Sequence, residues 1–73
     1  MQTFNHEKLA LLRELKDWSL LELTIQLHDA GVDLTPSAIV KWEQGENAPN
    51  AEYLPALAKV FGIRIEQLFT KQE

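Results

Sequence analysis

The chain of 73 residues contains no cysteine, which excludes disulfide bonds, thiolate zinc sites and a catalytic thiol. It also lacks an apolar run near the roughly 20 residues that are needed to span a bilayer. Residues 1–8 do not contain the apolar stretch of a signal peptide. We therefore expect a cytoplasmic protein that forms a single domain over residues 1–73 and has no membrane partner.

Basic residues are scarce: 7 Lys and Arg stand against 11 Asp and Glu, which gives a formal net charge of −4. Proteins that bind nucleic acid gain much of their affinity by neutralising phosphates with Lys and Arg. The acidic balance argues against strong non-specific binding to nucleic acid. It is compatible with specific binding, because charge can be distributed unevenly over a surface.

Side-chain constellations for catalysis or metal binding are absent from the sequence pattern. No nucleophile stands beside a base, no glycine-rich phosphate loop is present, and the acidic residues are spread along the chain. His6 and His28 are isolated and lack the paired spacing of zinc ligands. The sequence therefore predicts a protein that is not an enzyme and carries no metal or cofactor.

Glycine and proline are few, 3 of each, and they divide the chain into segments with helical periodicity. Asn5, Ser19 and Thr35 are residue types that cap helix N-termini, and Glu22 completes a capping box with Ser19. Each glycine stands where a helix is expected to end. The predicted helices span residues 6–17, 20–30, 36–44, 53–61 and 65–70.

Residues 42–45, with the sequence Trp-Glu-Gln-Gly, resemble the W-E-x-G motif of the Cro/phage-repressor (XRE) helix-turn-helix family, and Pro49 follows four residues later. Residues 53–63 resemble the family's "L…LA…GV" helix. The resemblance extends over roughly Leu9 to Phe69. It implies an all-α, five-helix fold of the lambda-repressor type. The core positions that it implies are Leu23, Leu27, Ile39, Trp42, Leu54, Leu57, Ala58, Phe61 and Leu68.

The same resemblance implies a sequence-specific, repressor-like transcriptional regulator that binds double-stranded DNA as a homodimer. Segment 36–44 would be the recognition helix in the major groove, and segment 65–70 would supply dimer contacts. Lys41 would donate to guanine, and Val40 would touch a thymine methyl group. The candidate DNA-binding residues are Thr35, Pro36, Ser37, Val40, Lys41, Gln44 and Asn47.

A salt bridge between Arg13 and Glu43 is a further implication of the resemblance, because many relatives pair a helix 1 arginine with the glutamate of W-E-x-G. The planar guanidinium of arginine suits a bidentate, partly buried pair with a carboxylate. The pair would also remove Glu43 as a repulsive charge near DNA. We expect Trp18 and Trp42 to lie in the core rather than to stack on bases.

The sequence departs from the family pattern in its second helix and in the turn that follows. Leu20 replaces a glutamine that commonly bonds a phosphate, and the turn over residues 28–34 is longer than usual. Leu21 and Ile25 are apolar where relatives are polar, and they share one helix face. Either the long turn folds over them, or they form an exposed patch for a protein partner. The second alternative would suit a protein-interaction module, such as an antitoxin that neutralises a toxin.

Overall fold

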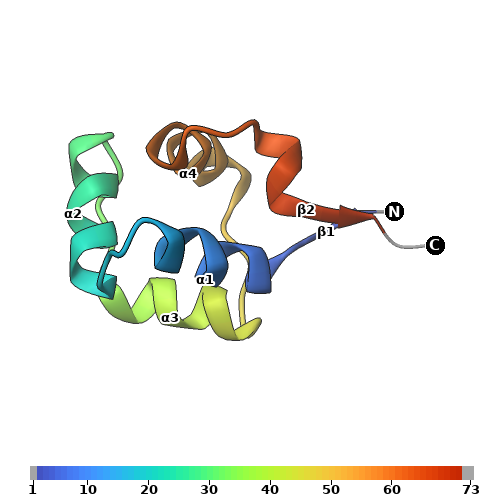
Figure 1. Cartoon of the computed structure of the whole chain (residues 1–73), viewed down its shortest axis with the longest axis horizontal. Coiled ribbons are helices and arrows are strands. Elements are labelled where there is room, and N and C mark those ends of the chain that lie inside the picture. The colour runs from blue at the N-terminus through green and yellow to red at the C-terminus, as the bar shows by residue number, and fades with distance from the viewer. Residues whose placement is uncertain (1, 72–73) are drawn as a thin grey trace.

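The computed structural model describes residues 2–71 and is mostly helical. Within that range it contains four α-helices, two short 3-10 helices and a small sheet. Figure 1 shows the helices packed together and the two strands projecting at the end of the molecule opposite α2. The elements are β1 (Gln2–Phe4), α1 (His6–Leu15), α2 (Leu20–Asp29), α3 (Pro36–Gln44), a 3-10 helix (Ala51–Tyr53), α4 (Leu54–Phe61), a second 3-10 helix (Ile65–Leu68) and β2 (Phe69–Lys71).

The predicted N-caps are all present. The side chain of Asn5 accepts from the N–H of Lys8 at 3.0 Å, and that of Thr35 accepts from the N–H of Ala38 at 3.4 Å. Ser19 and Glu22 form the complete capping box, with both bonds at 3.1 Å. These local bonds satisfy backbone donors that a helix leaves free at its start, so α1, α2 and α3 begin where the sequence predicts.

Two predicted helix ends differ by one or two residues. Helix α1 ends at Leu15 instead of residue 17, because Asp17 adopts a left-handed conformation with φ 60° that cannot continue a right-handed helix. Helix α2 ends at Asp29, one residue early. Gly45 and Gly62 terminate α3 and α4 with φ of 80° and 69°, a region that glycine enters without steric cost.

The predictions for the last two helices need correction. The predicted helix 53–61 starts with 3-10 geometry, and α-helical geometry begins only at Leu54. The predicted helix 65–70 is wrong, because only Ile65–Leu68 is helical, as a 3-10 helix, and Phe69–Lys71 is strand β2. Within residues 2–71 the fold thus has four α-helices and not the predicted five.

Strand β2 forms because it pairs with β1, from the other end of the chain. The two strands are antiparallel, with Thr3 opposite Thr70 and Phe4 opposite Phe69. The Phe4 and Phe69 rings pack edge to face, with centroids 6.1 Å apart. Strands of three residues have too little alternation to be seen in the sequence, and their pairing depends on residues more than sixty positions apart.

The core lies between the four helices, and the expectation for it holds at all positions but one. Leu54 is half-buried, while Leu9 of α1 is fully buried although it was not among the expected positions. Trp42 is buried against Tyr53, and Trp18 packs on Phe61. No helix in residues 2–71 is long and apolar enough to cross a membrane. The buried apolar side chains are Leu9, Leu23, Leu27, Ile39, Trp42, Leu57, Ala58, Phe61 and Leu68.

Candidate nucleic-acid interface

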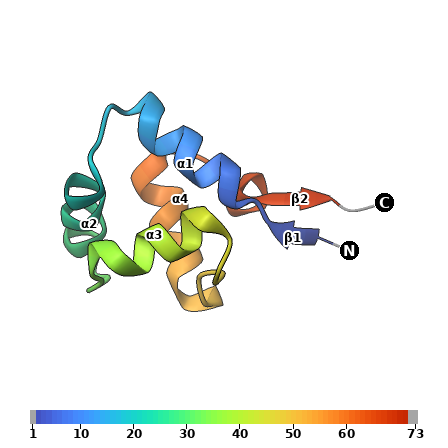
Figure 2. The ribbon, with the colours of Figure 1, turned by 90° about the horizontal axis from the view of Figure 1, so that it is seen from below.

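Helix α3 presents a polar face to solvent because its apolar residues are held in the core. Ile39 is fully buried and Trp42 is 5% exposed. The opposite face carries the exposed side chains of Ser37, Lys41 and Gln44. Figure 2 views the molecule from the side on which α3 lies nearest the reader, with α2 beside it.

The remaining predicted contact residues surround this face. Thr35 is exposed at the N-cap of α3, and Pro36 and Val40 are half-buried along its flank. Asn47 is exposed in the loop after α3. The structure therefore brings all seven candidate DNA-binding residues to one helix and its two ends, with Lys41 as the helix's basic residue.

The turn between α2 and α3 is anchored at several points. The N–H of Val32 donates to the carbonyl of Leu27 at 2.9 Å, after Gly31 reverses the chain with φ 93°. Val32 and Leu34 pack against the core. His28 Nδ1 contacts the carboxylate of Asp33 across the turn. These contacts set the orientation of α3 relative to α2 despite the length of the turn.

The ion pair between Arg13 and Glu43 is present and fixes α3 to α1. Arg13 Nε donates to Glu43 Oε2 at 2.7 Å, and Nη2 donates to Oε1 at 3.0 Å. The third guanidinium nitrogen, Nη1, donates to the carbonyl of Trp18 at 2.9 Å. The hydrogen bond to Glu43 raises the pKa of Arg13. Because both side chains are less than one-fifth exposed, the negative charge of Glu43 is compensated beside the polar face.

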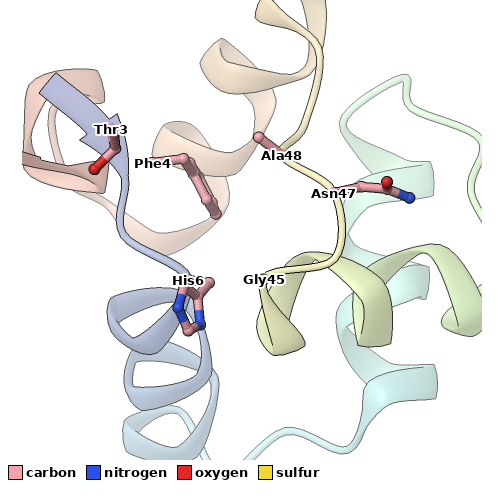
Figure 3. Close-up of a pocket in the computed structure, with 6 residues that line it drawn as sticks. All are labelled: Thr3, Phe4, His6, Gly45, Asn47 and Ala48. Carbon is pink, nitrogen blue, oxygen red and sulfur yellow. The ribbon is translucent and has the colours of Figure 1, made fainter.

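His6 contacts the C-terminal end of α3, a role that the sequence pattern does not indicate. Its Nδ1 lies 3.1 Å from the carbonyl oxygen of Glu43, so the ring donates to a helix-end carbonyl. The ring also lies against Gly45, where an added Cβ would come within 3.2 Å of it. Figure 3 shows His6 beside Gly45 at one end of a pocket. In the sequence, the only sign of a close contact at this helix end is the glycine at position 45.

Leu21 and Ile25 remain exposed, with 59% and 50% of their surface accessible. The expectation that the long turn covers them is wrong, because its apolar residues, Val32 and Leu34, pack on the core instead. In the segment expected to supply dimer contacts, Ile65 is 38% exposed. Leu68 and Phe69 belong to the core and to the sheet, so they offer little free surface.

Metal ligands do not cluster in this region. In the part of the chain that the structure describes, no group of three or more His, Asp or Glu side chains could hold a metal ion. The arrangement instead consists of donors and acceptors on an exposed helix that is braced by α1 and α2. Such an element can bond base edges and phosphates in a major groove.

Known proteins with similar sequences share the region that contains α3. Residues 9–68 match the family model described as helix-turn-helix. The HTH-type transcriptional activator BcrR of Enterococcus faecalis is 35% identical over 68 residues, which is 93% of this chain but 31% of the relative. The chain thus spans about a third of the length of that curated relative. From the matched residues and the observed fold, the chain belongs to the XRE-type helix-turn-helix family.

Proposed function

We propose that this chain binds a specific DNA sequence by placing α3 in the major groove and that it acts as a repressor-like regulator. The observation that carries the proposal is the exposed face of Ser37, Lys41 and Gln44 on a helix whose other face is buried. Lys41 donates to guanine O6 or N7, and Ser37 bonds either kind of base edge. Val40 contacts a thymine methyl group.

Contacts with phosphates position α3 without reading sequence. Gln44 and Asn47 supply side-chain donors near the C-terminal end of α3. The N-terminus of α3, at Thr35 and Pro36, supplies helix-dipole attraction for a phosphate. Leu20 makes no such bond, so this interface relies on α3 and its flanks more than the family pattern implies.

Binding as a homodimer follows from the short length of the reading element. One helix contacts only a few base pairs, and two copies on a two-fold operator greatly increase discrimination. The half-sites would lie about one helical turn, ~34 Å, apart. Repression would follow if such an operator overlaps a promoter; a promoter-reporter assay with and without the protein measures whether expression falls or rises.

The test is selection of bound DNA from a random library with wild type, Lys41→Ala and Lys59→Ala in parallel. Lys59 is the matched control, because it is an exposed lysine on α4 rather than α3. We expect an enriched sequence with two half-sites. Lys41→Ala should lose about 1–3 kcal/mol of binding free energy and relax one position of the sequence. Equal effects of the two lysine variants would contradict base reading by α3.

A second candidate function, binding of a protein partner such as a toxin, is favoured by the exposure of Leu21 and Ile25. An antitoxin of this kind would neutralise its partner through α2 while α3 remains free for DNA. The measurement is binding of a toxin encoded beside the gene, with Leu21→Glu and Ile25→Glu compared with wild type. Unchanged binding by both variants would remove this candidate.

A further inference from the structure

We propose that strand β1 pairs with β1 of a second copy and that this pairing forms the dimer which reads DNA. The inference rests on the proposed function, because it supplies the contact for the proposed homodimer. It uses the small sheet, which the sequence did not predict and which the DNA-reading face does not involve.

The hydrogen-bond pattern of the sheet leaves one edge of β1 available. The N–H of Asn5 donates to the carbonyl of Leu68 at 2.8 Å, which makes these two residues a hydrogen-bonded pair. Because such pairs alternate along an antiparallel ladder, Thr3 and Thr70 form the next one. The backbone N–H and C=O groups of Gln2 and Phe4 therefore point away from β2, toward the outer edge of β1.

This edge is short, but it lacks two features by which proteins block unwanted pairing, a charged side chain and a proline. Residues 2–4, Gln-Thr-Phe, contain no charge and no proline, whereas β2 contains Lys71. Figure 3 shows a pocket on the side of β1 away from β2. The pocket is lined by Thr3, Phe4 and His6 on one side and by Gly45, Asn47 and Ala48 on the other. The pocket separates this edge of β1 from the loop that follows α3.

Antiparallel pairing about a two-fold axis has a register that satisfies these free groups. With Thr3 opposite Thr3 of the second copy, Gln2 of each copy stands opposite Phe4 of the other. Each of these pairs then exchanges both N–H···O=C bonds. The two threonines form the intervening pair without hydrogen bonds, with Cα atoms about 4.5 Å apart.

The orientation of the sheet suits DNA recognition. In Figure 2 the two strands lie side by side and face-on when α3 is nearest the reader. The two-fold axis of such a strand pair is perpendicular to the sheet, so it keeps the α3 helices of both copies on the same side. The dimer therefore presents both polar faces to one DNA duplex.

The spacing is also suitable. The chain extends 35 Å along its longest axis, and the strands project from one end of it. Overlapping three-residue strands, each about 10 Å long, place the centres of two end-to-end copies on the order of 25 Å apart. In Figures 1 and 2, α3 lies on the α2 side of the middle of the molecule, so the α3 helices are farther apart than the centres. A separation larger than about 25 Å leaves room for half-sites ~34 Å apart.

The interface of two three-residue strands is small, so we expect the free protein to be monomeric and the dimer to form on DNA. Because the chain has no cysteine, a single introduced cysteine reports this contact cleanly. In the proposed dimer, Thr3→Cys places one cysteine on each side of the two-fold axis. Their Cα atoms would be about 4.5 Å apart, a separation that a disulfide can bridge. Thr70→Cys is the matched control, because it is an exposed threonine in the same sheet whose copies would lie about 14 Å apart.

The experiment measures disulfide formation by both variants under mild oxidation, with the selected operator, with unrelated DNA and without DNA. We expect Thr3→Cys on the operator to cross-link at least about tenfold faster than Thr70→Cys. A second comparison uses Gln2→Pro, which removes the outward N–H, and Gln2→Ala, which keeps it. The proline variant should weaken binding to the two-half-site operator about tenfold or more relative to the alanine variant, and leave single half-site binding unchanged.

The outcomes separate this inference from the proposed function. If two copies bind the operator but the two cysteine variants cross-link equally slowly, the strand contact is refuted and DNA reading by α3 stands. If no DNA sequence is selected but Thr3→Cys alone cross-links at high protein concentration, the strand contact stands and the proposed function fails. Equal operator binding by the two Gln2 variants would also refute the strand contact.

Discussion

At the scale of single residues, the contact that most affects α3 is the one between Arg13 and Glu43. The guanidinium uses two nitrogens for the carboxylate and a third for the carbonyl of Trp18. One side chain therefore joins α1, the α1–α2 turn and α3. Removal of either partner leaves a charged group in a site that is mostly shielded from water, which costs more than the pair itself contributes.

Arg13→Ala should lower the free energy of unfolding by about 2 kcal/mol or more, because Glu43 is left unpaired and Trp18 loses a donor. Arg13→Lys should recover only part of this, since an ammonium cannot form the bidentate pair. Urea denaturation of the single variants, Glu43→Ala and the double variant measures the coupling energy. A coupling energy near zero would show that the pair is not a stabilising contact.

The pH dependence of this contribution follows from the raised pKa of Arg13. A group whose pKa is higher in the folded state contributes stability that is fully present below its unfolded pKa. That stability is lost only as the pH rises through the folded pKa, in strongly alkaline solution. The difference in unfolding free energy between wild type and Arg13→Ala should thus be equal at about pH 7 and about pH 9, as measured by urea denaturation at both.

Asp17 is a second residue with a measurable local effect. Among residues 2–71 it is the only non-glycine residue with a positive φ, 60°, and it lies in the turn between α1 and α2. Asp17→Gly should raise the free energy of unfolding by up to about 1 kcal/mol, because glycine adopts this conformation without steric cost. Asp17→Val should lower it, since a β-branched side chain is strained there. Thermal unfolding of both variants measures the two effects, which must have opposite signs.

At the scale of elements, each end of α3 is fixed by a specific contact. Its N-terminus is capped by Thr35, and its C-terminus ends at Gly45 under the ring of His6. Gly62 ends α4 in a similar conformation, but nothing lies within 4 Å of the position of its added Cβ. Gly45 thus has a contact with His6 that has no counterpart at Gly62.

Gly62→Ala should lower the free energy of unfolding by about 1 kcal/mol, the usual cost of alanine in the left-handed region. Gly45→Ala should lower the free energy of unfolding further, because the added Cβ would lie 3.2 Å from the His6 ring and the ring would have to move. The same two substitutions in a His6→Ala background should cost equal amounts. If the difference between the glycines persists without His6, the ring is not its cause.

At the scale of the whole molecule, the net charge of −4 sets how binding responds to salt. Lys41 is the basic residue of α3, and Glu46 is exposed in the loop that follows it. Few phosphates can be neutralised by such a surface. If the proposed dimer forms, affinity comes from hydrogen bonds and from the pairing of two copies more than from release of counterions.

The logarithm of the DNA association constant should therefore fall with the logarithm of salt concentration with a shallow slope, well below about 10 in magnitude. Titrations of the selected operator at several salt concentrations measure it. Lys41→Ala should reduce the slope by at most about one unit. A slope near 10 would mean that many more lysine and arginine side chains reach phosphates than the exposed surface of α3 provides.

Local signals determined where most helices begin and end. The caps at Asn5, Ser19 and Thr35 act within three residues, and so does the capping box with Glu22, so they are visible in the sequence. The family resemblance implied the core positions Leu23, Leu27, Ile39 and Trp42, and all four are buried. The family resemblance added the position of α3 and the Arg13–Glu43 pair.

Contacts between distant parts of the chain decided the rest. Phe69 and Thr70 leave the predicted helix because β1 pairs with them, and His6 contacts Gly45 only because α1 packs beside α3. Whether Val32 and Leu34 cover the core or the Leu21/Ile25 face depends on the path of the turn in space. The sequence by itself determined the helices and the polar face of α3, since these depend on near neighbours. The tertiary structure alone decided the sheet and the exposed apolar face, because both depend on residues far apart in the chain.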